Sequence, residues 1–391
     1  MITFEEALKI VLDNAPQCGT EKVRLENSMG RFLVEDVTSD VEMPPFDKSA
    51  MDGFACRHED QDKELEIIET IAAGNPPKKK VMEGQCARIM TGAMVPKGAN
   101  VVVKVEDTEI SREGKVRILK PTTKSNIAMK AEDVQVGHVA VTSGIRIEPQ
   151  HIAVMASVGW TNPLVARKPA VGVISTGDEI VESHHKPNVS QIRNSNGPQL
   201  TAQADRAGAN ATYFGIARDD EKLTYDLLSK ALDESDVVLL SGGVSMGEYD
   251  FIPGVLEKLG IELKFKTVAI QPGKPTVFGL KNDKRIFGLP GNPVSSFTTF
   301  ELFVRPMLNK MMGSKEPYRK LKMPLEVDYT RKKASRMSWI PVQFTEEGTV
   351  IPLEYHGSAH IYALAGAHAM AAVPAGTRLL KKGEKVDVRQ V

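Results

Sequence analysis

Residues 285–296 read RIFGLPGNPVSS, a short apolar run that leads through Pro, Gly and Asn into a helical pattern. An apolar run of this length between turn residues is typical of a buried strand. Three similar runs precede it, at VGVIS (171–175), ATYFGI (211–216) and DVVLL (236–240), and helical patterns lie between them at about 197–207, 220–233 and 252–259. Strands that alternate with helices predict βαβ units and a mostly parallel sheet.

The segments on either side of this α/β region have a different pattern. Residues 3–15 predict a helix whose capping box is Thr3 and Glu6. From about residue 41, VEMPPFDKSAMDGFA is rich in Pro, Asp and Gly and predicts a loop. Residues 65–142 hold short apolar runs split by Gly, Pro and Lys clusters, which predicts a small β-rich module. Residues 148–160 predict a second helix, and residues 316–391 return to short strands and turns, which predicts a small β-barrel or sandwich.

The composition is that of an ordinary globular protein. The 391 residues carry 50 Lys+Arg against 50 Asp+Glu, so no basic excess supports a purely electrostatic nucleic-acid binder. Three widely spaced cysteines form no CxxC, which argues against a disulfide framework or a zinc ribbon and fits a reducing compartment. An acidic N-terminus and the lack of a run of roughly 18 apolar residues predict a soluble, cytoplasmic protein without membrane contact.

Polar or glycine-rich loops follow four predicted strands. They are Thr176-Gly177-Asp178-Glu179, Ser241-Gly242-Gly243-Val244-Ser245, Pro272-Gly273-Lys274-Pro275 after a strand ending at Ile270, and Pro290-Gly291-Asn292-Pro293. Ligands of open α/β sheets bind beyond the carboxyl ends of the strands. We therefore expect the four loops to meet at one edge and to bind a phosphate-bearing ligand.

The chemistry of the loops supports this expectation. Closely approaching backbone N–H groups and serine hydroxyls suit phosphate. Asn292 as N-cap and Pro293 as first helical residue would start a helix whose positive end favours an anion. Asp178, Glu179 and Asp250 offer the hard oxygen ligands that Mg²⁺ prefers between phosphates. Each loop alone could be a tight turn or helix-start chemistry, but the four together favour the phosphate site. No Walker A or GxGxxG pattern occurs.

These motifs are part of a longer series. The series is FDKSAMDGFA (46–55), RIMTGAMVPKGANVVV (88–103), STGDEI (175–180), SGGVSMGEYD (241–250), PGKP (272–275), GLPGNPVSS (288–296) and GS (357–358). In order and in coverage of nearly the whole chain, the series resembles the molybdopterin molybdenumtransferase (MoeA) family, which includes the C-terminal part of gephyrin. The combination of MDG, MTGA and GLPGNP makes this resemblance specific.

The resemblance implies a fold and a reaction. The implied architecture is a discontinuous linker and dimerisation domain (1–42 plus 138–165), a β-rich inserted domain (43–137), an α/β domain (166–315) and a C-terminal β-barrel (316–391). The implied reaction inserts molybdate into adenylylated molybdopterin and releases AMP with Mg²⁺. A homodimer with a cleft shared between its subunits and a molybdopterin adenylyltransferase as upstream partner are implied as well.

The resemblance also assigns residues. The candidate catalytic residues are Asp52, Thr91, Asp133, Glu179, Asp219 and Asp250. The candidate ligand-binding residues are Ser175, Thr176, Gly177, Asp178, Ser241, Gly242, Gly243, Ser245, Gly273, Lys274, Pro290, Gly291, Asn292, Pro293 and Ser358. The candidate metal ligands are Asp178, Glu179 and Asp250.

Several basic positions of the family pattern hold other residues in this chain. Thr267, Gln271 and Pro341 stand where the family often has lysine or arginine near the expected oxyanion site. Loss of charge-assisted contacts weakens anion binding, so we hypothesise that the pterin-nucleotide scaffold is kept while the oxyanion pocket is altered. Tungstate as the oxyanion, a non-catalytic binding protein, and a molybdopterin adenylyltransferase are the alternative hypotheses.

Overall fold

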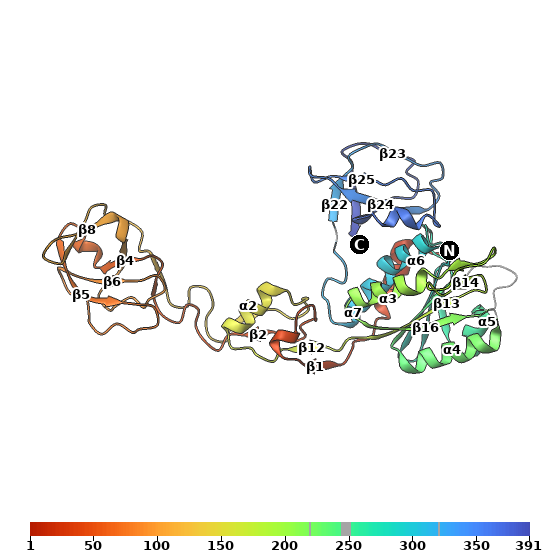
Figure 1. Cartoon of the computed structure of the whole chain (residues 1–391), viewed down its shortest axis with the longest axis horizontal. Coiled ribbons are helices and arrows are strands. Elements are labelled where there is room, and N and C mark those ends of the chain that lie inside the picture. Colours follow the sequence, from red (N-terminus) through yellow and green to blue (C-terminus); the bar gives the residue numbers. More distant parts are fainter. Residues whose placement is uncertain (219, 244–251, 320) are drawn as a thin grey trace.

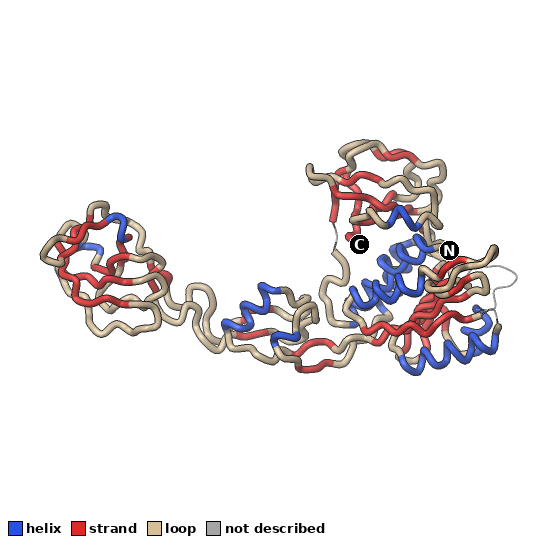
Figure 2. The backbone as a smooth tube through the Cα atoms, in the orientation of Figure 1, coloured by secondary structure: helices blue, strands red, loops and turns tan. Residues whose placement is uncertain are grey.

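The computed structural model describes residues 1–218, 220–243, 252–319 and 321–391. The chain is elongated and bent: a β-rich part lies at one end, a slender connector follows, and an α/β part at the other end carries a β-barrel on one side (Figure 1). Helices concentrate in the α/β part, while the two outer parts are mostly strand and loop (Figure 2). No described helix has the length and apolar character needed to cross a membrane.

The central sheet of the α/β part is mixed. Its strands, in spatial order, are β16 (Asn210–Ala217), β13 (Ala170–Thr176), β17 (Val237–Ser241), β21 (Lys284–Leu289), β20 (Val277–Lys281) and β18 (Glu262–Phe265). The first four strands are parallel to one another. Strand β20 runs antiparallel to β21, and β18 runs antiparallel to β20. The four runs predicted from the sequence are therefore strands of the parallel half, and their carboxyl ends share one edge.

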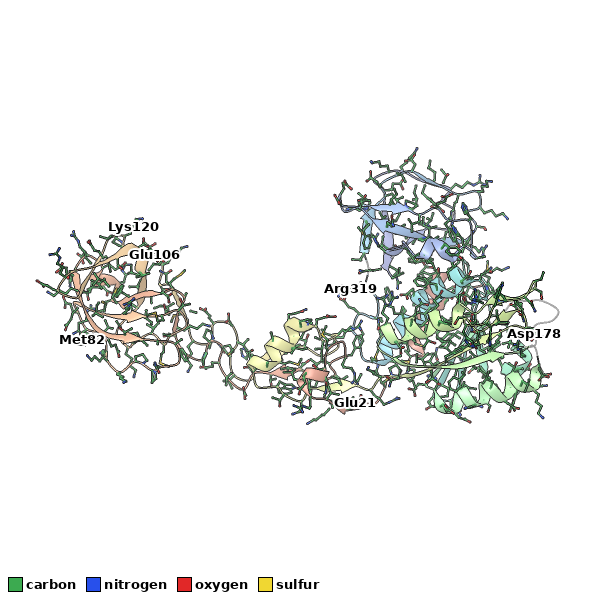
Figure 3. All side chains as sticks on the ribbon, in the orientation of Figure 1. Glu21, Met82, Glu106, Lys120, Asp178 and Arg319 are labelled. Carbon is green, nitrogen blue, oxygen red and sulfur yellow. The ribbon has the colours of Figure 1, made fainter. Side chains whose placement is uncertain are left out.

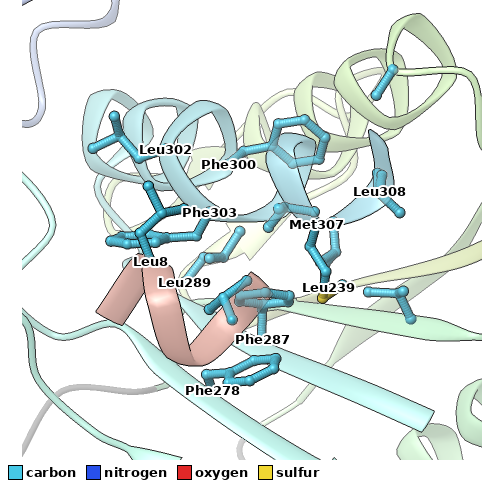
Figure 4. Packing of buried hydrophobic residues seen from close by; sticks show 14 of the residues in the cluster. Leu8, Leu239, Phe278, Phe287, Leu289, Phe300, Leu302, Phe303, Met307 and Leu308 are labelled. Atoms are coloured by element: carbon cyan, nitrogen blue, oxygen red, sulfur yellow. The ribbon is translucent and has the colours of Figure 1, made fainter. Parts of the chain in front are cut away.

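Helices cover both faces of this sheet. The elements are α1 (Phe4–Asp13), α3 (Asn196–Arg206), α4 (Glu221–Glu234), α5 (Ile252–Lys258), α6 (Pro293–Thr299), the π-helical turn η4 (Phe300–Val304), α7 (Arg305–Met311) and the short pair β14 (Ile180–Val181) and β15 (Ile192–Arg193). Helices α1, α3 and α7 and the turn η4 enclose the larger core, shown in Figure 4, and α4 and α5 cover the opposite face. The predicted capping box of Thr3 and Glu6 starts α1, and Asn292 and Pro293 start α6 as predicted.

One predicted strand belongs to a different sheet. The strand before Pro272, β19 (Ile270–Gln271), pairs with β24 of the C-terminal part and not with the α/β sheet. The loop after it nevertheless reaches the predicted edge, because β20 runs antiparallel and its first residue, Val277, pairs with Gly288 near the end of β21. The prediction that four strand ends of one sheet carry these loops was therefore wrong, because β19 belongs to the other sheet. Its loop still lies at the same edge, because a loop before an antiparallel strand and a loop after a parallel strand share that edge.

Helix α1 does not pack with the connector, with which the predicted domain division had grouped it. Phe4 and Leu8 of α1 lie in the α/β core, and the ring of Phe4 contacts Phe303 and Trp339 with centroids 5.7 and 5.5 Å apart. Helix α1 thus packs with the α/β part, although the prediction placed residues 1–42 with 138–165. Its apolar face is complementary to α7 and η4, a partner that the sequence of α1 alone does not specify.

The connector has its own small core. Its elements are β1 (Thr20–Lys22), η1 (Leu25–Asn27), β2 (Val37–Thr38), β11 (Val139–Val141), α2 (Pro149–Ser157) and β12 (Leu164–Ala166). Strand β1 pairs with β12 and β2 with β11, so the outgoing and returning chains lie side by side. Buried apolar residues such as Leu33, Ile147 and Met155 hold the two passages together.

The β-rich part is a six-stranded sheet with a short satellite ladder. Its elements are β3 (Lys48–Ser49), β4 (Gly53–Cys56), η2 (His58–Asp60), β5 (Glu64–Ile71), β6 (Gln85–Ile89), β7 (Val101–Lys104), η3 (Val105–Asp107), β8 (Thr108–Ile110), β9 (Lys115–Ile118) and β10 (Ile127–Ala128). The order is β7-β4-β6-β5-β9-β8, and β3 pairs with β10. Two apolar clusters pack on this sheet, so the inserted part has a core of its own.

The C-terminal part closes into a small barrel. Its elements are β22 (Leu321–Pro324), β23 (Tyr329–Thr330), β24 (Met337–Phe344), β25 (Val350–Pro352), η5 (Ile361–Leu364), β26 (Ala369–Val373), β27 (Leu379–Leu380) and β28 (Lys385–Gln390). The ladder runs β25-β24-β26-β28-β22, and a bridge between Leu325 and Val350 joins its two ends. The predicted β-barrel is confirmed.

Candidate active site

The loops after β13, β17 and β21 converge at one edge of the α/β sheet. A Cβ atom on Gly242 would lie 2.8 Å from the carbonyl oxygen of Thr176, and a Cβ on Gly291 would lie 3.5 Å from Cα of Gly242. Gly242 also has a φ of 93°, a conformation that side chains disfavour. Glycine at position 242 therefore lets the three loops approach one another closely.

Asn196, the first residue of α3, connects two of these loops. Its Nδ2 donates to Ser241 Oγ at 2.6 Å and to the carbonyl oxygen of Gly291 at 2.7 Å. The carbonyl oxygen of Gly291 can only accept a hydrogen bond, so the NH₂ end of the Asn196 amide, and not its oxygen, must face the two loops. Ser241 Oγ is then an acceptor toward Asn196, which leaves its own proton free to donate to a ligand.

The sequence analysis did not assign a role to Asn196. An asparagine at a helix start usually indicates a cap, and this signal conceals a contact with loops 45 and 95 residues away. The side chain is 9% exposed, and its Oδ1 is buried without a hydrogen-bond partner among the described residues. An unpaired buried acceptor is costly, so this position has a polar group to offer to a bound molecule or to water.

A second asparagine and serine pair joins the barrel to the same edge. Asn292 Nδ2 donates to Ser358 Oγ at 2.8 Å, and the backbone N–H of Val294 donates to the carbonyl oxygen of Ser358 at 3.1 Å. The loop of the barrel that carries Ser358 is thus fixed on the first turn of α6. Ser358 Oγ accepts from an amide just as Ser241 Oγ does, so its proton is also free to donate.

Two predicted ligand-binding residues are largely enclosed. Ser175 is 1% exposed and donates to Asn194 Oδ1 at 3.0 Å, and Asn194 Nδ2 donates to the hydroxyl of Tyr213 at 2.7 Å. Burial raises the pKa of Tyr213 above its usual range, and its hydrogen bond to Glu182 adds to the shift. Thr176 is 6% exposed and donates to the carbonyl oxygen of Ser241 at 3.3 Å. In this structure both side chains support the loops beside the edge.

The carboxylates after β13 are exposed at the sheet edge. Asp178 and Glu179 directly follow Gly177, and Arg218 donates to the backbone carbonyl oxygen of Asp178 at 3.3 Å. Mg²⁺ is commonly held by one or two carboxylates plus substrate phosphates, and this donor set fits that arrangement. Within the described part of the chain, no three His, Cys, Asp or Glu side chains gather as a metal site. The predicted residues Asp219, Ser245 and Asp250 lie outside the described residues.

The loop 272–276 adds a cation at this edge. Gly273 is buried, and a Cβ on it would lie 2.5 Å from Cγ2 of Thr299 in α6. Lys274 is exposed. The structure therefore packs the loop against α6 through Gly273 and leaves Lys274 open to solvent.

Asp52 and Thr91 form a compact pair in the β-rich part. Asp52 Oδ1 accepts from the backbone N–H of Thr91 at 2.6 Å and from its hydroxyl at 2.9 Å. These two hydrogen bonds hold the pKa of the Asp52 carboxyl below its usual range. The pair lines a hollow of about 430 Å³ whose other residues are Met51, Lys104, Glu106 and Asp107.

The glycine of the MDG motif has a steric role beside this pair. A Cβ on Gly53 would lie 1.9 Å from the carbonyl oxygen of Val103 on the neighbouring strand β7. Only glycine therefore allows β4 to pair with β7 directly after Asp52. The motif thus places the carboxylate at the rim of the hollow.

The two groups of predicted residues do not meet within one chain. Glu106, which lines the hollow of Asp52, and Asp178, at the sheet edge, lie at opposite ends of the molecule (Figure 3). Asp133 is exposed in the passage between the β-rich part and the connector, where its backbone N–H donates to the carbonyl oxygen of Met43. A catalytic centre that uses both groups needs a second copy of the chain.

The substituted basic positions lie near the junction of α/β part and barrel. Thr267 accepts a backbone hydrogen bond from Ile2, Gln271 pairs with Ser338, and Pro341 is buried in β24. Arg336 is a basic residue close to Pro341 in sequence, and it donates to the carbonyl oxygen of Ile270 at 2.9 Å. The question of an altered oxyanion pocket stays a hypothesis.

Comparison with known proteins covers almost the whole chain. Residues 2–159 match the MoeA N-terminal region (domain I and II), residues 172–310 match a probable molybdopterin binding domain, and residues 322–391 match the MoeA C-terminal region (domain IV). A molybdopterin molybdenumtransferase of Staphylococcus epidermidis is 36% identical over 398 residues, which is 99% of this chain and 95% of that protein.

The chain belongs to the MoeA family. Two crystal structures of molybdopterin biosynthesis MoeA proteins from Pyrococcus horikoshii are similar over the full chain. One has a TM-score of 0.85 at 31% identity and covers 100% of both chains; the other has a TM-score of 0.79 at 34% identity and covers 100% of this chain and 99% of that one. MoeA proteins act in molybdenum cofactor biosynthesis, and this chain is an enzyme of that process. The resemblance drawn from the motifs is confirmed.

Proposed function

We propose that this MoeA-family enzyme inserts molybdenum from molybdate into adenylylated molybdopterin and releases AMP. The observation that carries the proposal is the pair of serine hydroxyls, Ser241 and Ser358, whose protons two asparagine amides leave free for an anion. Hydroxyl protons and a helix start recognise phosphate and oxyanion oxygens. The α/β sheet edge is therefore the side that binds the substrate's negative groups.

Individual residues have distinct roles in this proposal. Ser241 and the glycine loops hold the phosphoanhydride, while Ser358 and Lys274 hold molybdate where the barrel meets α6. Asp178 and Glu179 would hold Mg²⁺ together with substrate phosphates, and the ion would neutralise charge that develops on the leaving AMP. Pro290 and Pro293 shape the pocket beside the pterin.

The β-rich part acts on the substrate of a partner subunit. We infer a homodimer in which Asp52 and Thr91 of one chain face the sheet edge of the other. The hollow that these two residues line together with Glu106 and the sheet edge that carries Asp178 lie at opposite ends of a single chain (Figure 3). Asp52 is kept ionised by Thr91, so it can accept a proton or orient a water at the phosphoanhydride. We place the reaction in the cytoplasm, downstream of a molybdopterin adenylyltransferase that supplies the adenylylated substrate.

The test is AMP release from adenylylated molybdopterin with Mg²⁺, in the presence of molybdate, tungstate or neither. Oxyanion-stimulated release is expected, and the more effective oxyanion identifies the metal. Ser358→Ala should lower the stimulation by about 10-fold or more, since a hydrogen bond to a charged group is lost. Ser335→Ala, an exposed serine of the same barrel, is the control. Tight substrate binding with no release under any condition would contradict the proposal and favour a binding protein.

A further inference from the structure

A second hollow lies away from the sheet edge, where several parts of the chain meet. It has a volume of about 720 Å³ and is lined by residues from segment 142–151 of the connector, the end of α3, the start of α7, residues 314–319, Leu321 and the last residues of β28. Arg319, one of its lining residues, marks its place in the bend between the barrel and the rest of the chain (Figure 3). None of the predicted site residues lines it, so it is separate from the candidate active site.

The lining of this hollow is predominantly basic. Its cations are Arg146, Arg206, Arg305, Lys315, Arg319 and Arg389, against the carboxylates of Glu148, Glu301 and Glu316. Glu301 is already shared by two of the cations: Arg206 donates to one of its oxygens at 2.5 Å and Arg305 to the other at 2.7 Å. Within the described ranges, the other four cations have no carboxylate partner.

Arg389 is the most unusual of these cations. Its guanidinium carbon lies 3.9 Å from the centroid of the Tyr318 ring and 5.8 Å from that of Trp339, and its Nη1 is buried without a hydrogen-bond partner among the described residues. Burial lowers the pKa of Arg389 to about 10, and the charge of nearby Arg305 adds to the shift. The carboxylates of Asp387 and Glu301 act on Arg389 at longer range, and among the described residues neither forms an ion pair with it. A bound anion would supply the direct contact that Nη1 lacks.

We propose that this hollow binds a small molecule that carries at least one phosphate group. Arginine forks match phosphate oxygens in geometry as well as in charge, and a volume of this size is typical of small-molecule sites at domain boundaries. The phosphate would sit between Arg389 and Arg319, and the remaining volume admits a group up to the size of a nucleoside. Because the hollow is built from connector, α/β part and barrel, the ligand would hold these three parts in one arrangement.

Trp339 offers a direct readout of this site. The sequence has two tryptophans, so Trp160→Phe leaves Trp339, beside Arg389, as the only tryptophan, whose emission can be excited apart from that of tyrosine. Titration of this variant with pyrophosphate should give a saturable change in Trp339 emission. Comparison with ATP distinguishes the source of the phosphate: tighter binding of ATP identifies a nucleotide, and equal or weaker binding identifies an inorganic phosphate. Absence of any saturable change with either ligand would overturn the proposal.

Variants assign the signal to the hollow. In the Trp160→Phe chain, Arg389→Met should weaken binding by about 10- to 100-fold, the effect of losing one charge-assisted contact. The melting temperature of the unliganded chain is measured alongside, because the same change removes the stacking of Arg389 on Tyr318. Arg319→Met, at an exposed position that carries little folding risk, should weaken binding in the same direction. Arg378→Met, an exposed arginine of the same barrel outside the hollow, is the matched control. Equal binding by the Arg389 and Arg319 variants and the unsubstituted chain would overturn the proposal.

Discussion

The two halves of the proposed catalytic centre differ in charge and in enclosure. The sheet edge presents hydroxyl protons, a helix start and Lys274, with its supporting side chains buried. The hollow of the β-rich part presents exposed Asp52 beside Glu106 and Asp107. The first suits the negative groups of a substrate and the second suits proton acceptance or water orientation. Neither half alone offers both, and for this reason we propose that the chain acts as a dimer.

The largest effect is expected from the acidic half. Asp52→Asn keeps the size of the side chain but removes its charge, so AMP release should fall by at least about 100-fold, as for other general bases. Binding of adenylylated molybdopterin should change much less, because the sheet edge is intact. Single-turnover AMP release and equilibrium binding measure the two effects separately. Asp62→Asn, an exposed acid of the same part, is the control, and equal activity of both variants would remove Asp52 from the mechanism.

Changes at the sheet edge, the anion-binding half, should lower the affinity for the substrate. Asn196→Asp is nearly isosteric but replaces the amide donor that serves Ser241 and Gly291 with an acceptor. Substrate affinity should fall by about 10-fold or more, and the free energy of unfolding by about 1–3 kcal/mol, since buried acceptors then face each other. Isothermal titration and denaturant unfolding measure these effects, with exposed Asn162→Asp as control. Unchanged substrate affinity would show that Ser241 does not need the amide of Asn196 to bind the substrate.

The contact between barrel and α6 should have a smaller effect. Asn292→Ala removes one exposed hydrogen bond to Ser358 but leaves the backbone bond from Val294. We expect molybdate stimulation of AMP release to need a few-fold more molybdate, with the maximal rate little changed. A titration of molybdate at saturating pterin substrate measures this. A loss of maximal rate without a change in the molybdate requirement would contradict the role given to Ser358.

The smallest effect concerns pH. Thr91→Val keeps the backbone N–H that bonds Asp52 but removes the hydroxyl, so the pKa of Asp52 should rise part of the way to its usual value. The acidic limb of the rate profile should therefore move to higher pH. The same bonds stabilise the fold above the unfolded-state pKa of Asp52, and that contribution is lost as pH falls through the lower folded value. A shift of the acidic limb to lower pH would contradict the conclusion that the hydroxyl of Thr91 lowers the pKa of Asp52.

The sequence predicted the parts of the fold that depend on local patterns. The parallel strands, the capping box of Thr3 and the start of α6 at Asn292 follow from short-range hydrophobic spacing and backbone chemistry. The placement of α1 and of β19 could not be predicted in this way, because both depend on complementary surfaces far along the chain: about 300 residues for Phe4 and Phe303, and 67 for Ile270 and Met337.

The candidate site shows the same limit. Glycine loops are visible in the sequence because glycine is required by the close approach of backbones, as at Gly242. The hydrogen bonds of Asn196 are not visible, since an asparagine that caps a helix and one that joins two distant loops look alike. In the sequence Arg389 likewise resembles an ordinary strand arginine, and only the structure shows that its buried Nη1 has no hydrogen-bond partner among the described residues.

The most direct test of the split centre is complementation between two impaired chains. Chains with Asp52→Asn and chains with Asn196→Asp are co-expressed with different tags, and the mixed dimers are purified. AMP release is measured at a substrate concentration well below the dissociation constant, where the lower affinity of the Asn196→Asp chain lowers its rate. If Asp52 serves the sheet edge of its partner, each mixed dimer has one intact centre and regains about half of the wild-type AMP release. If both residues serve the same chain, every centre carries one defect, and mixed dimers as impaired as the parent variants would contradict the account.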